Sequence, residues 1–263
     1  MSGGSGGASF LILGCGYTGA RVAARLVARG ARVTAESRDP ERLRRNLPGV
    51  EVLRLGEALP IAPGTRVLHS LPVPFAKLIV GAARLVYLST TGVYGDQPEV
   101  NETTPVAPRN AREQTRADEE RDVAAVCENH LILRPAAIYG PGRGVHVSLR
   151  EGKHRYWGDG SNYISRIHVD DLAALSEAAL YSDLTGAFPV ADDEPARAID
   201  ITRFCANLLS MPIPPPEAGL PGEDTRRSNR RVDGRAIRRA LQVELTFPSY
   251  RVGIPAALAI TTS

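Results

Sequence analysis

Short apolar runs alternate with segments of helical periodicity through the first two thirds of the chain. This alternation predicts an α/β fold, a doubly wound parallel sheet with helices on both faces. Within 19–29, Val22, Leu26 and Val27 recur at helical spacing, and Gly30 ends the predicted helix. The predicted strands are 10–13, 32–35, 50–53, 67–69, 85–88 and 131–133, and a second helix is predicted over 105–127.

Two stretches depart from this regular alternation. Only 14 residues, 71–84, separate the fourth and fifth predicted strands, which is near the minimum for a right-handed crossover. The pattern therefore predicts either a very short helix there or a connection unlike that of related folds. After Gly140 the texture changes: 141–160 is rich in loop residues, five prolines fall in 211–222, and 229–241 predicts one basic helix.

This change of texture predicts two domains. We expect a larger α/β domain over 1–140 and about 166–185, and a small C-terminal substrate lobe over about 141–165 and 186–263. Open α/β sheets bind ligands at the carboxyl ends of their strands. The smaller lobe is therefore expected to cover that edge of the sheet.

Composition and charge exclude several classes of protein. Lysine and arginine exceed aspartate and glutamate by only three (32 against 29), so net charge gives no reason to expect a nucleic-acid partner. No apolar run approaches the roughly 20 residues that cross a bilayer, so no membrane association is expected. Cys15, Cys127 and Cys205 are scattered, which argues against a disulfide framework or a zinc site. We expect a cytoplasmic protein that binds no metal.

A glycine-rich turn follows the first predicted strand and opens the first predicted helix. Its residues are Gly14-Cys15-Gly16-Tyr17-Thr18-Gly19, which fit G-x-G-x-x-G in the context that this motif requires. The first glycine allows the tight turn, the second lets the backbone approach a pyrophosphate, and the third lets helix and strand pack closely. The helix N-terminus adds a partial positive charge. The turn predicts dinucleotide binding in a Rossmann fold, and we interpret Cys15 as a small residue that fits rather than a redox group.

The end of the second predicted strand bears on the choice of nicotinamide cofactor. An acidic side chain there would bind the adenosine ribose of NAD, whereas Arg38 could pair with the 2′-phosphate of NADP and Ser37 could add a hydroxyl. Glu36 keeps NAD open as the alternative if its carboxylate points into the pocket. The other interpretation of Arg38 is an exposed residue before a helix that Asp39 caps. We expect NADP.

Four blocks make the chain resemble the extended short-chain dehydrogenase/reductase family, which includes NAD-dependent epimerase/dehydratase enzymes acting on nucleotide sugars. They occur in the family's order and cover most of the chain. The blocks are the glycine-rich turn, Leu88-Ser89-Thr90-Thr91-Gly92-Val93-Tyr94-Gly95, Leu133-Arg134-Pro135-Ala136-Ala137-Ile138-Tyr139-Gly140-Pro141-Gly142 and Ile167-His168-Val169-Asp170-Asp171-Leu172-Ala173, with 190–195 as a weaker fifth. The resemblance implies a Rossmann fold and a nicotinamide cofactor; dimers are common in the family, so a homodimer is one of the oligomeric states left open.

The resemblance also implies roles for particular residues. The family's substrate-binding hydroxyl falls on Thr90, the block at Pro135 resembles the loop that borders the nicotinamide, and the block at His168 resembles the start of a helix that closes the substrate cleft. Asp170 or Asp171 could instead only cap that helix. The residues implied are Thr90 and Tyr139 for catalysis, Ser89 and Pro135 for the cofactor, and Thr91, Tyr94, Arg166 and His168 for the substrate.

The chain departs from the family at the acid–base pair. The family's Tyr-x-x-x-Lys positions, counted from Pro108, hold Arg112 and Arg116, with Glu120 four residues further on. Reversible hydride transfer at an alcohol needs a group that exchanges a proton near neutral pH, which tyrosine beside lysine does and arginine does not. Arginine can still polarise a carbonyl or bind a carboxylate or phosphate through two parallel hydrogen bonds. The chain resembles divergent members of the family that have lost this pair.

Two functions of different classes remain open. The first is an NADP-dependent oxidoreductase or epimerase/dehydratase-like enzyme. In it Thr90 binds the reacting oxygen, Arg112 and Arg116 hold an anionic or nucleotide-linked small molecule, and a tyrosine supplies the proton. The candidate proton donors are Tyr94, Tyr139 and Tyr163. The second function is a non-catalytic module that senses NADP, which the missing pair favours and the retained hydroxyl counts against. We expect the enzyme.

Overall fold

The computed structural model describes residues 8–54, 56–217, 219 and 227–261, and its contacts divide the chain into two compact units. The first unit takes in the described parts of Met1–Ser89, Gln114–Leu133 and Ala173–Ala187. The second takes in the described parts of Thr90–Glu113, Arg134–Leu172 and Phe188–Ser263. Each unit therefore combines segments that are far apart in the sequence.

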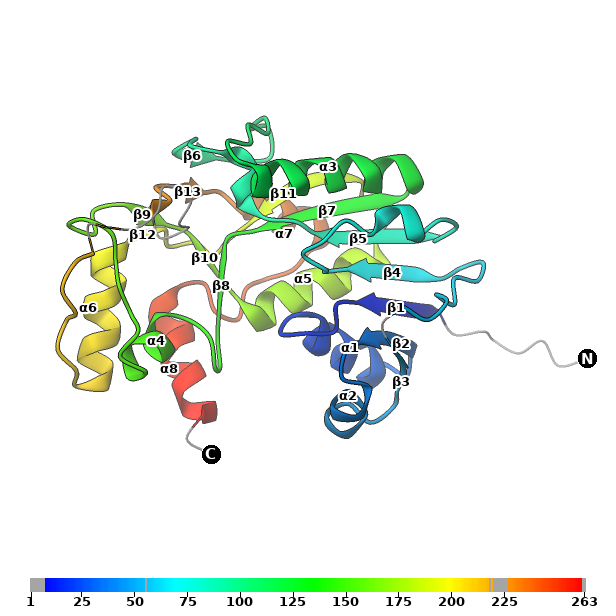
Figure 1. The fold of residues 1–263 in the computed structure, drawn as a ribbon, viewed down its shortest axis with the longest axis horizontal. Coiled ribbons are helices and arrows are strands. Elements are labelled where there is room, and N and C mark those ends of the chain that lie inside the picture. Colours follow the sequence, from blue (N-terminus) through cyan, green and yellow to red (C-terminus); the bar gives the residue numbers. More distant parts are fainter. Residues whose placement is uncertain (1–7, 55, 218, 220–226, 262–263) are drawn as a thin grey trace, which may run out of the picture. The chain divides into compact units, whose positions relative to one another are not determined.

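The first unit is built on a seven-stranded sheet, and every strand pair whose register is defined is parallel. The strands are β1 (Ser9–Leu13), β2 (Arg32–Ser37), β3 (Val50–Arg54), β4 (Arg66–His69), β5 (Arg84–Leu88), β7 (His130–Pro135) and β11 (Gly186–Val190). Their order is β11-β7-β5-β4-β1-β2-β3 (Figure 1). The chain builds outward from β1 to β3 and then resumes on the other side of β1 with β4. All six predicted strands and the Rossmann topology are confirmed.

Helices cover both faces of this sheet, as predicted. They are α1 (Gly19–Ala28), α2 (Pro40–Asn46), α3 (Ala111–Val126) and α5 (Val169–Tyr181). Side chains alternate between the faces of a strand, so Leu11 and Leu13 of β1 share one face and pack in a cluster with Val123 of α3. On the other face, the ring centroid of Phe10 lies 5.2 Å from that of Tyr181 at the end of α5.

Helix α3 begins six residues later than predicted, at Ala111 rather than at residue 105. The Asn110 side chain accepts a hydrogen bond from the Glu113 amide (2.9 Å), and the Glu113 carboxylate accepts one from the Arg109 amide (2.8 Å). This reciprocal arrangement resembles a capping box and fixes the start of the helix. Pro108, which cannot donate a backbone hydrogen bond, precedes it.

The connection from β4 to β5 contains only one turn of 3₁₀ helix, η1 (Ala76–Leu78). The prediction of a very short helix is therefore confirmed. The buried side chains of Ala76 and Ile79, with partly buried Leu71 and Phe75, join the cluster between the sheet and α3. In this short crossover an irregular loop, rather than a helix, therefore packs its apolar side chains against the sheet.

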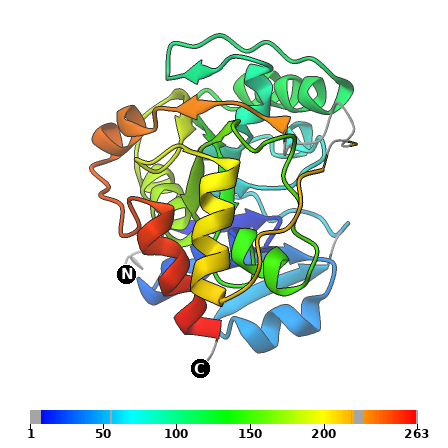
Figure 2. The same cartoon turned by 90° about the vertical axis from the view of Figure 1, so that its left-hand side faces the viewer.

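The second unit consists of short elements around a helical core. They are η2 (Thr91–Tyr94), β6 (Glu99–Val100), β8 (Ala137–Tyr139), α4 (Val145–Arg150), β9 (Tyr163–Ile164), β10 (Arg166–His168), β12 (Ala196–Arg197), α6 (Ala198–Leu209), β13 (Arg231–Val232), α7 (Arg235–Leu241) and α8 (Tyr250–Thr261). The strands pair as β10-β8, β12-β9 and β13-β6. Helices α6 and α8 lie side by side (Figure 2), and Ile201, Cys205, Tyr250 and Ile254 form their buried contact.

The prediction of a single basic helix over 229–241 is wrong in its first half. Arg231 and Val232 form β13, and the helix begins only at Arg235. The Asp233 side chain accepts a hydrogen bond from the Arg235 amide (2.9 Å), and a Cβ at Gly234 would lie 2.5 Å from the Ala191 backbone nitrogen. A tight turn packed against another segment therefore separates strand from helix. The proline-rich stretch 211–222 falls partly outside the described residues.

Candidate functional site

The glycine-rich turn connects β1 to α1 and uses its three glycines for different reasons. Gly14 has φ of +84°, and a Cβ there would lie 2.7 Å from the Ser70 hydroxyl. A Cβ at Gly19 would lie 2.5 Å from the Gly14 carbonyl oxygen. A Cβ at Gly16 would meet nothing within 4 Å. Two glycines are thus required by conformation and close packing, and the third leaves the space beside it open to a ligand.

Ser70, which directly follows β4, anchors this turn and was missed by the sequence analysis. Its hydroxyl lies 3.0 Å from the Leu13 carbonyl oxygen and 2.7 Å from that of Gly14, and its amide donates to the Leu13 carbonyl (2.9 Å). The serine therefore joins the ends of β1 and β4, where the strand order reverses. Its signal in the sequence is a small polar residue directly after an apolar strand.

The start of α1 suits an anionic ligand. The helix has ten residues, and Thr18 at its N-cap makes no side-chain hydrogen bond to the first turn. The Ala20 and Arg21 amides already donate to the Gly16 and Thr18 carbonyls (both 3.0 Å), so an anion would be attracted mainly by the partial positive charge at this end of the helix. Together with the open space beside Gly16, this end of α1 fits a pyrophosphate, so the residues present can hold a dinucleotide.

Cys15 and Tyr17 fill the outer positions of the turn. Burial raises the pKa of the Cys15 thiol to about 12, so the side chain is protonated at neutral pH. The Arg21 guanidinium lies 4.4 Å from the centroid of the Tyr17 ring and donates to the Tyr17 carbonyl (2.7 Å). The contacts of Arg21 brace the turn from α1, and the raised pKa of Cys15 favours a packing role for that residue.

The three residues at the end of β2 have different surroundings. Glu36 is 3% exposed, and its carboxylate accepts a hydrogen bond from the Gly56 amide (3.3 Å) after β3. The Ser37 hydroxyl accepts from the Asp39 amide (3.0 Å). Arg38 is exposed and makes no hydrogen bond or ion pair with any residue that the structure describes. Asp39 caps α2 by accepting from the Arg42 amide (3.1 Å), which is what the alternative interpretation of this segment expected.

The turn after β5 carries the predicted catalytic hydroxyl. Thr90 is half-buried at the start of η2, and its hydroxyl accepts a hydrogen bond from the Gly92 amide (3.1 Å). Thr91 and Tyr94 are buried, and the Tyr94 hydroxyl accepts from Arg134 Nη1 (3.0 Å). The Ser89 hydroxyl, in the other unit, donates to the Glu120 carboxylate (2.5 Å). Thr90 is thus the accessible member of its block.

The two arginines in place of Tyr-x-x-x-Lys differ in their surroundings. Arg112 is exposed and makes no hydrogen bond or ion pair with a described residue. Arg116 is half-buried, and its Nη1 donates to the Leu71 carbonyl (3.0 Å) and to the Tyr87 hydroxyl (2.8 Å). Arg112 therefore has its full hydrogen-bonding capacity for a ligand, whereas part of that of Arg116 is already used.

The Arg-Pro-x-x-x-Tyr block places Pro135 and Tyr139 in buried positions. Pro135 is the last residue of β7. The Tyr139 hydroxyl donates to the Ser249 carbonyl (3.1 Å), and burial raises the pKa of Tyr139 well above its usual value. Tyr139 stays a prediction as proton donor, although these contacts favour a structural role.

Arg166 and His168, predicted to contact substrate, are enclosed by protein. The Arg166 guanidinium donates to the Ile164 carbonyl (2.9 Å). The His168 ring lies between Phe247 and Tyr139, with centroids 3.9 and 5.2 Å away. Contact of either with a substrate would need this packing to open, and both stay predictions.

Asp171 and Asp192 are buried carboxyl groups of the second unit. Asp171 accepts from the Thr246 and Phe247 amides (2.8 and 3.0 Å), so it holds the chain before α8 rather than capping α5. Asp192 is 2% exposed, and burial raises its pKa to about 8, although buried Arg166 opposes this shift. Neither role was predicted from the sequence.

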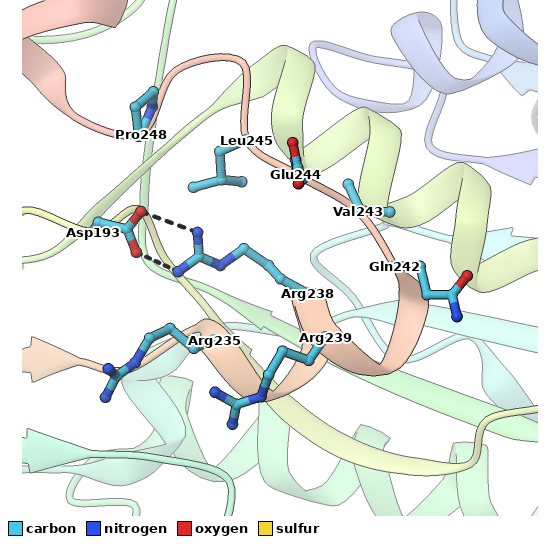
Figure 3. Close-up of a pocket in the computed structure, with 9 residues that line it drawn as sticks. All are labelled: Asp193, Arg235, Arg238, Arg239, Gln242, Val243, Glu244, Leu245 and Pro248. Carbon is cyan, nitrogen blue, oxygen red and sulfur yellow. Dashed lines mark hydrogen bonds and ion pairs between the residues drawn. The ribbon is translucent and has the colours of Figure 1, made fainter.

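Two neighbouring pockets of about 540 and 550 Å³ open within the second unit. The first is lined on one side by Arg235, Arg238 and Arg239 of α7, and Figure 3 shows the Arg238 guanidinium beside Asp193 while Arg235 and Arg239 point away from it. Arg238 forms an ion pair with Asp193, and one of its two contacts measures 3.2 Å. This lining could accept an anionic group.

Nowhere in the described part of the chain do three or more His, Cys, Asp or Glu side chains gather in a way that could hold a metal ion. Among the same residues, every helix is too short or too polar to cross a bilayer.

Comparisons with known proteins identify relatives. The model of the NAD dependent epimerase/dehydratase family matches residues 64–187. A 3-diazoavenalumate denitrifying reductase from a Streptomyces species is 34% identical over 148 residues, which are 51% of this chain and 49% of that protein. The chain thus spans about half the length of this curated relative.

Solved structures match nearly the whole chain. A functionally unknown conserved protein from Silicibacter pomeroyi is 32% identical with a TM-score of 0.84, and the match covers 97% of this chain and 100% of that one. MoeE5 in complex with UDP-glucose and NAD shares the fold, with 18% identity, a TM-score of 0.80 and coverage of 97% and 98%. Residues 64–187 therefore match the NAD-dependent epimerase/dehydratase family, and the chain as a whole has a Rossmann fold.

Proposed function

We propose that this protein is an NADP-dependent oxidoreductase that reduces or oxidises an anionic small molecule without the Tyr-x-x-x-Lys pair. The observation that carries the proposal is the site formed by the glycine-rich turn and the end of β2. There the space beside Gly16 is open to a ligand, and Arg38 has no partner among the described residues. The bound cofactor would supply or accept a hydride.

The surroundings of β2 favour NADP over NAD. The Glu36 carboxylate, which would bind the ribose of NAD, is buried and accepts from the Gly56 amide. Arg38 is the exposed cation that could pair with a 2′-phosphate, and Ser37 lies beside it. A guanidinium binds a phosphate through two parallel hydrogen bonds, which an NAD hydroxyl cannot offer it.

Calorimetric titration with NADPH and NADH tests the cofactor assignment. We expect the wild type to prefer NADPH, and Arg38→Ala to weaken NADPH binding about tenfold because a charge-assisted contact is lost. NADH affinity should not change in this variant. Arg45→Ala, an exposed arginine in the last turn of α2, is the matched control and should bind both nucleotides as the wild type does. Equal affinity of Arg38→Ala and wild type for NADPH would exclude the role of Arg38.

Thr90 is our candidate for the residue that binds the reacting oxygen. Its hydroxyl accepts from the Gly92 amide, which orients the group and leaves its proton to be donated. We infer that Arg112 holds the anionic part of the substrate, because its guanidinium has no partner among the described residues. Cofactor binding would then belong to the first unit and substrate recognition largely to the second.

A turnover assay tests the Thr90 assignment. NADPH oxidation would be screened with carbonyl compounds, nucleotide sugars such as UDP-glucose, which MoeE5 binds, and 3-diazoavenalumate, the compound named for the Streptomyces reductase. Thr90→Val should abolish turnover and leave NADPH affinity unchanged. Thr90→Ser keeps the hydroxyl and should retain turnover. A fully active Thr90→Val variant would exclude the assignment.

A non-catalytic NADP sensor is the second candidate. The use of Arg116 to bind the Leu71 carbonyl and the Tyr87 hydroxyl favours it, because the acid–base position then serves the structure. A sensor would bind NADP⁺ and NADPH with different affinities and exchange no hydride with any substrate. Turnover of a substrate that depends on Thr90 would exclude this candidate.

A further inference from the structure

The loop after β4 is too short to contain a regular helix. Its backbone amides and carbonyls therefore lack the hydrogen bonds that a crossover helix would provide. Buried backbone amides and carbonyls require partners, and η1 is only one turn. Glu119 of α3 supplies an acceptor: its Oε1 receives hydrogen bonds from the Phe75 and Ala76 amides, both at 2.7 Å. Arg116, one turn earlier, donates to the Leu71 carbonyl (3.0 Å). Two side chains of one helix therefore hold both ends of this loop.

A histidine and a tyrosine from the sheet complete the arrangement. His69 Nε2 lies 2.7 Å from Glu119 Oε1, and its Nδ1 accepts from the Leu71 amide (3.4 Å). These partners assign the proton to Nε2, which donates to the carboxylate. The His69 ring stacks on Tyr87 with centroids 4.7 Å apart, and the Tyr87 hydroxyl accepts from Arg116 (2.8 Å). The network is a continuous set of contacts within the first unit.

Burial and hydrogen bonding set the protonation of this network. His69 is 0% and Glu119 is 2% exposed. Burial lowers the pKa of His69, which keeps the imidazole neutral. Burial also opposes ionisation of Glu119, but the hydrogen bonds from His69 and two backbone amides outweigh it and hold the pKa of Glu119 below its usual value. A buried carboxylate with three donors fixes the positions of all three.

The loop that is held in this way lies beside the glycine-rich turn. Ser70, between His69 and Leu71, binds the Leu13 and Gly14 carbonyls. The strand order reverses between β1 and β4, and dinucleotides bind in the crevice at such a reversal. The first residues after β4 therefore pack directly against the turn, at the reversal where a dinucleotide would bind.

We propose that Arg116 and Glu119 are positioning residues for the dinucleotide, because they fix the loop of residues 70–76 as a preformed wall of the crevice between β1 and β4. The inference rests on the proposed cofactor function and adds residues that do not themselves touch the cofactor. Arg116, at the family's lysine position, here substitutes for the missing crossover helix. A preformed wall strengthens binding because the ligand does not have to order it.

The test is calorimetric titration of NADPH into the wild type and four variants. We expect Glu119→Ala to bind NADPH about tenfold more weakly at unchanged stoichiometry. Glu119→Gln keeps an acceptor oxygen and should recover most of this affinity. Arg116→Met, a milder change at a half-buried site, should weaken binding in the same direction. Asp118→Ala, on the exposed side of α3, should bind as the wild type does.

The possible results separate positioning from folding. A purely structural role would lower the fraction of protein able to bind, and thus the stoichiometry, but would leave the dissociation constant unchanged. That result, or wild-type affinity in Glu119→Ala, would overturn the proposal. If Glu119→Ala does not fold, wild-type affinity in Arg116→Met would overturn it. Failure of the wild type to bind NADPH would overturn the proposed function first and this role with it.

Discussion

Two connections meet at the point where the strand order of the sheet reverses, and they are built by opposite means. The conformation of the β1–α1 turn is allowed by glycines within the turn, and the turn leads into a ten-residue helix. The β4–β5 crossover has no such helix, and its backbone is held by side chains of α3. One side of the crevice is therefore set by local conformation and the other by distant side chains.

This difference explains why one connection was predicted from the sequence and the other only in length. Gly14, Gly16 and Gly19 are a local pattern whose meaning follows from conformation alone. Glu119 contacts Phe75 and Ala76 across more than forty positions, and nothing in its own segment distinguishes it from partly exposed Asp118 or from buried Glu120 beside it. Connections of the second kind need a structure to be recognised.

The largest effect is expected at the glycine-rich β1–α1 turn. Gly14→Ala would combine a left-handed φ with a Cβ 2.7 Å from the Ser70 hydroxyl. We expect it to abolish NADPH binding and lower the free energy of unfolding by about 4 kcal/mol. Gly30→Ala is the matched control, because Gly30 has φ of +77° but open space around it. It should cost only about 1 kcal/mol in urea unfolding and bind NADPH normally.

The next largest effect is expected at the β4–β5 crossover, which side chains of α3 hold in place. Glu119→Ala leaves the Phe75 and Ala76 amides and His69 without their acceptor in a buried place. We expect the free energy of unfolding to fall by about 3 kcal/mol in urea denaturation. Asp118→Ala should change it by less than about 0.5 kcal/mol. A loss for Glu119→Ala no larger than that of the control would show that the loop is held by its apolar contacts instead.

The smallest expected effect is a pH dependence that the crossover contributes through His69. Because the pKa of His69 is lowered in the folded protein from 6.5, the unfolded chain takes up a proton more readily. The stabilisation is therefore complete above pH 6.5 and is lost as the pH falls below it. Between about pH 7.5 and about pH 5.5, the free energy of unfolding of the wild type should fall by about 1 kcal/mol more than that of His69→Gln. The Gln amide in this variant can still donate to Glu119. Parallel pH curves for the two proteins would contradict this assignment.

The same contrast between local and distant determinants applies to the rest of the molecule. Every predicted strand is present, because short apolar runs bounded by polar or turn residues indicate buried strands by themselves. The basic segment 229–241 was predicted as one helix because its composition is uniform, whereas its pairing with β6 and the close packing of Gly234 on Ala191 make its first half a strand and turn. These are contacts between segments far apart in the chain.

Within the candidate site, the glycine-rich turn and Asp39 as a helix cap were predictable, since both depend on neighbours in the sequence. Ser70 and the partners of Arg116 were not, because their roles depend on which strands lie side by side. The direction of the Glu36 side chain, which bears on the choice of cofactor, was left open by the sequence for the same reason.

The measurement that tests the central claim most directly is hydrogen exchange of the whole protein with and without saturating NADPH. If the cofactor binds between the two connections, amides of residues 14–21 and 70–76 should both gain protection, with a smaller gain at 37–40. Protection confined to segments of the second unit, such as 231–245, or no protection at either connection, would contradict the account.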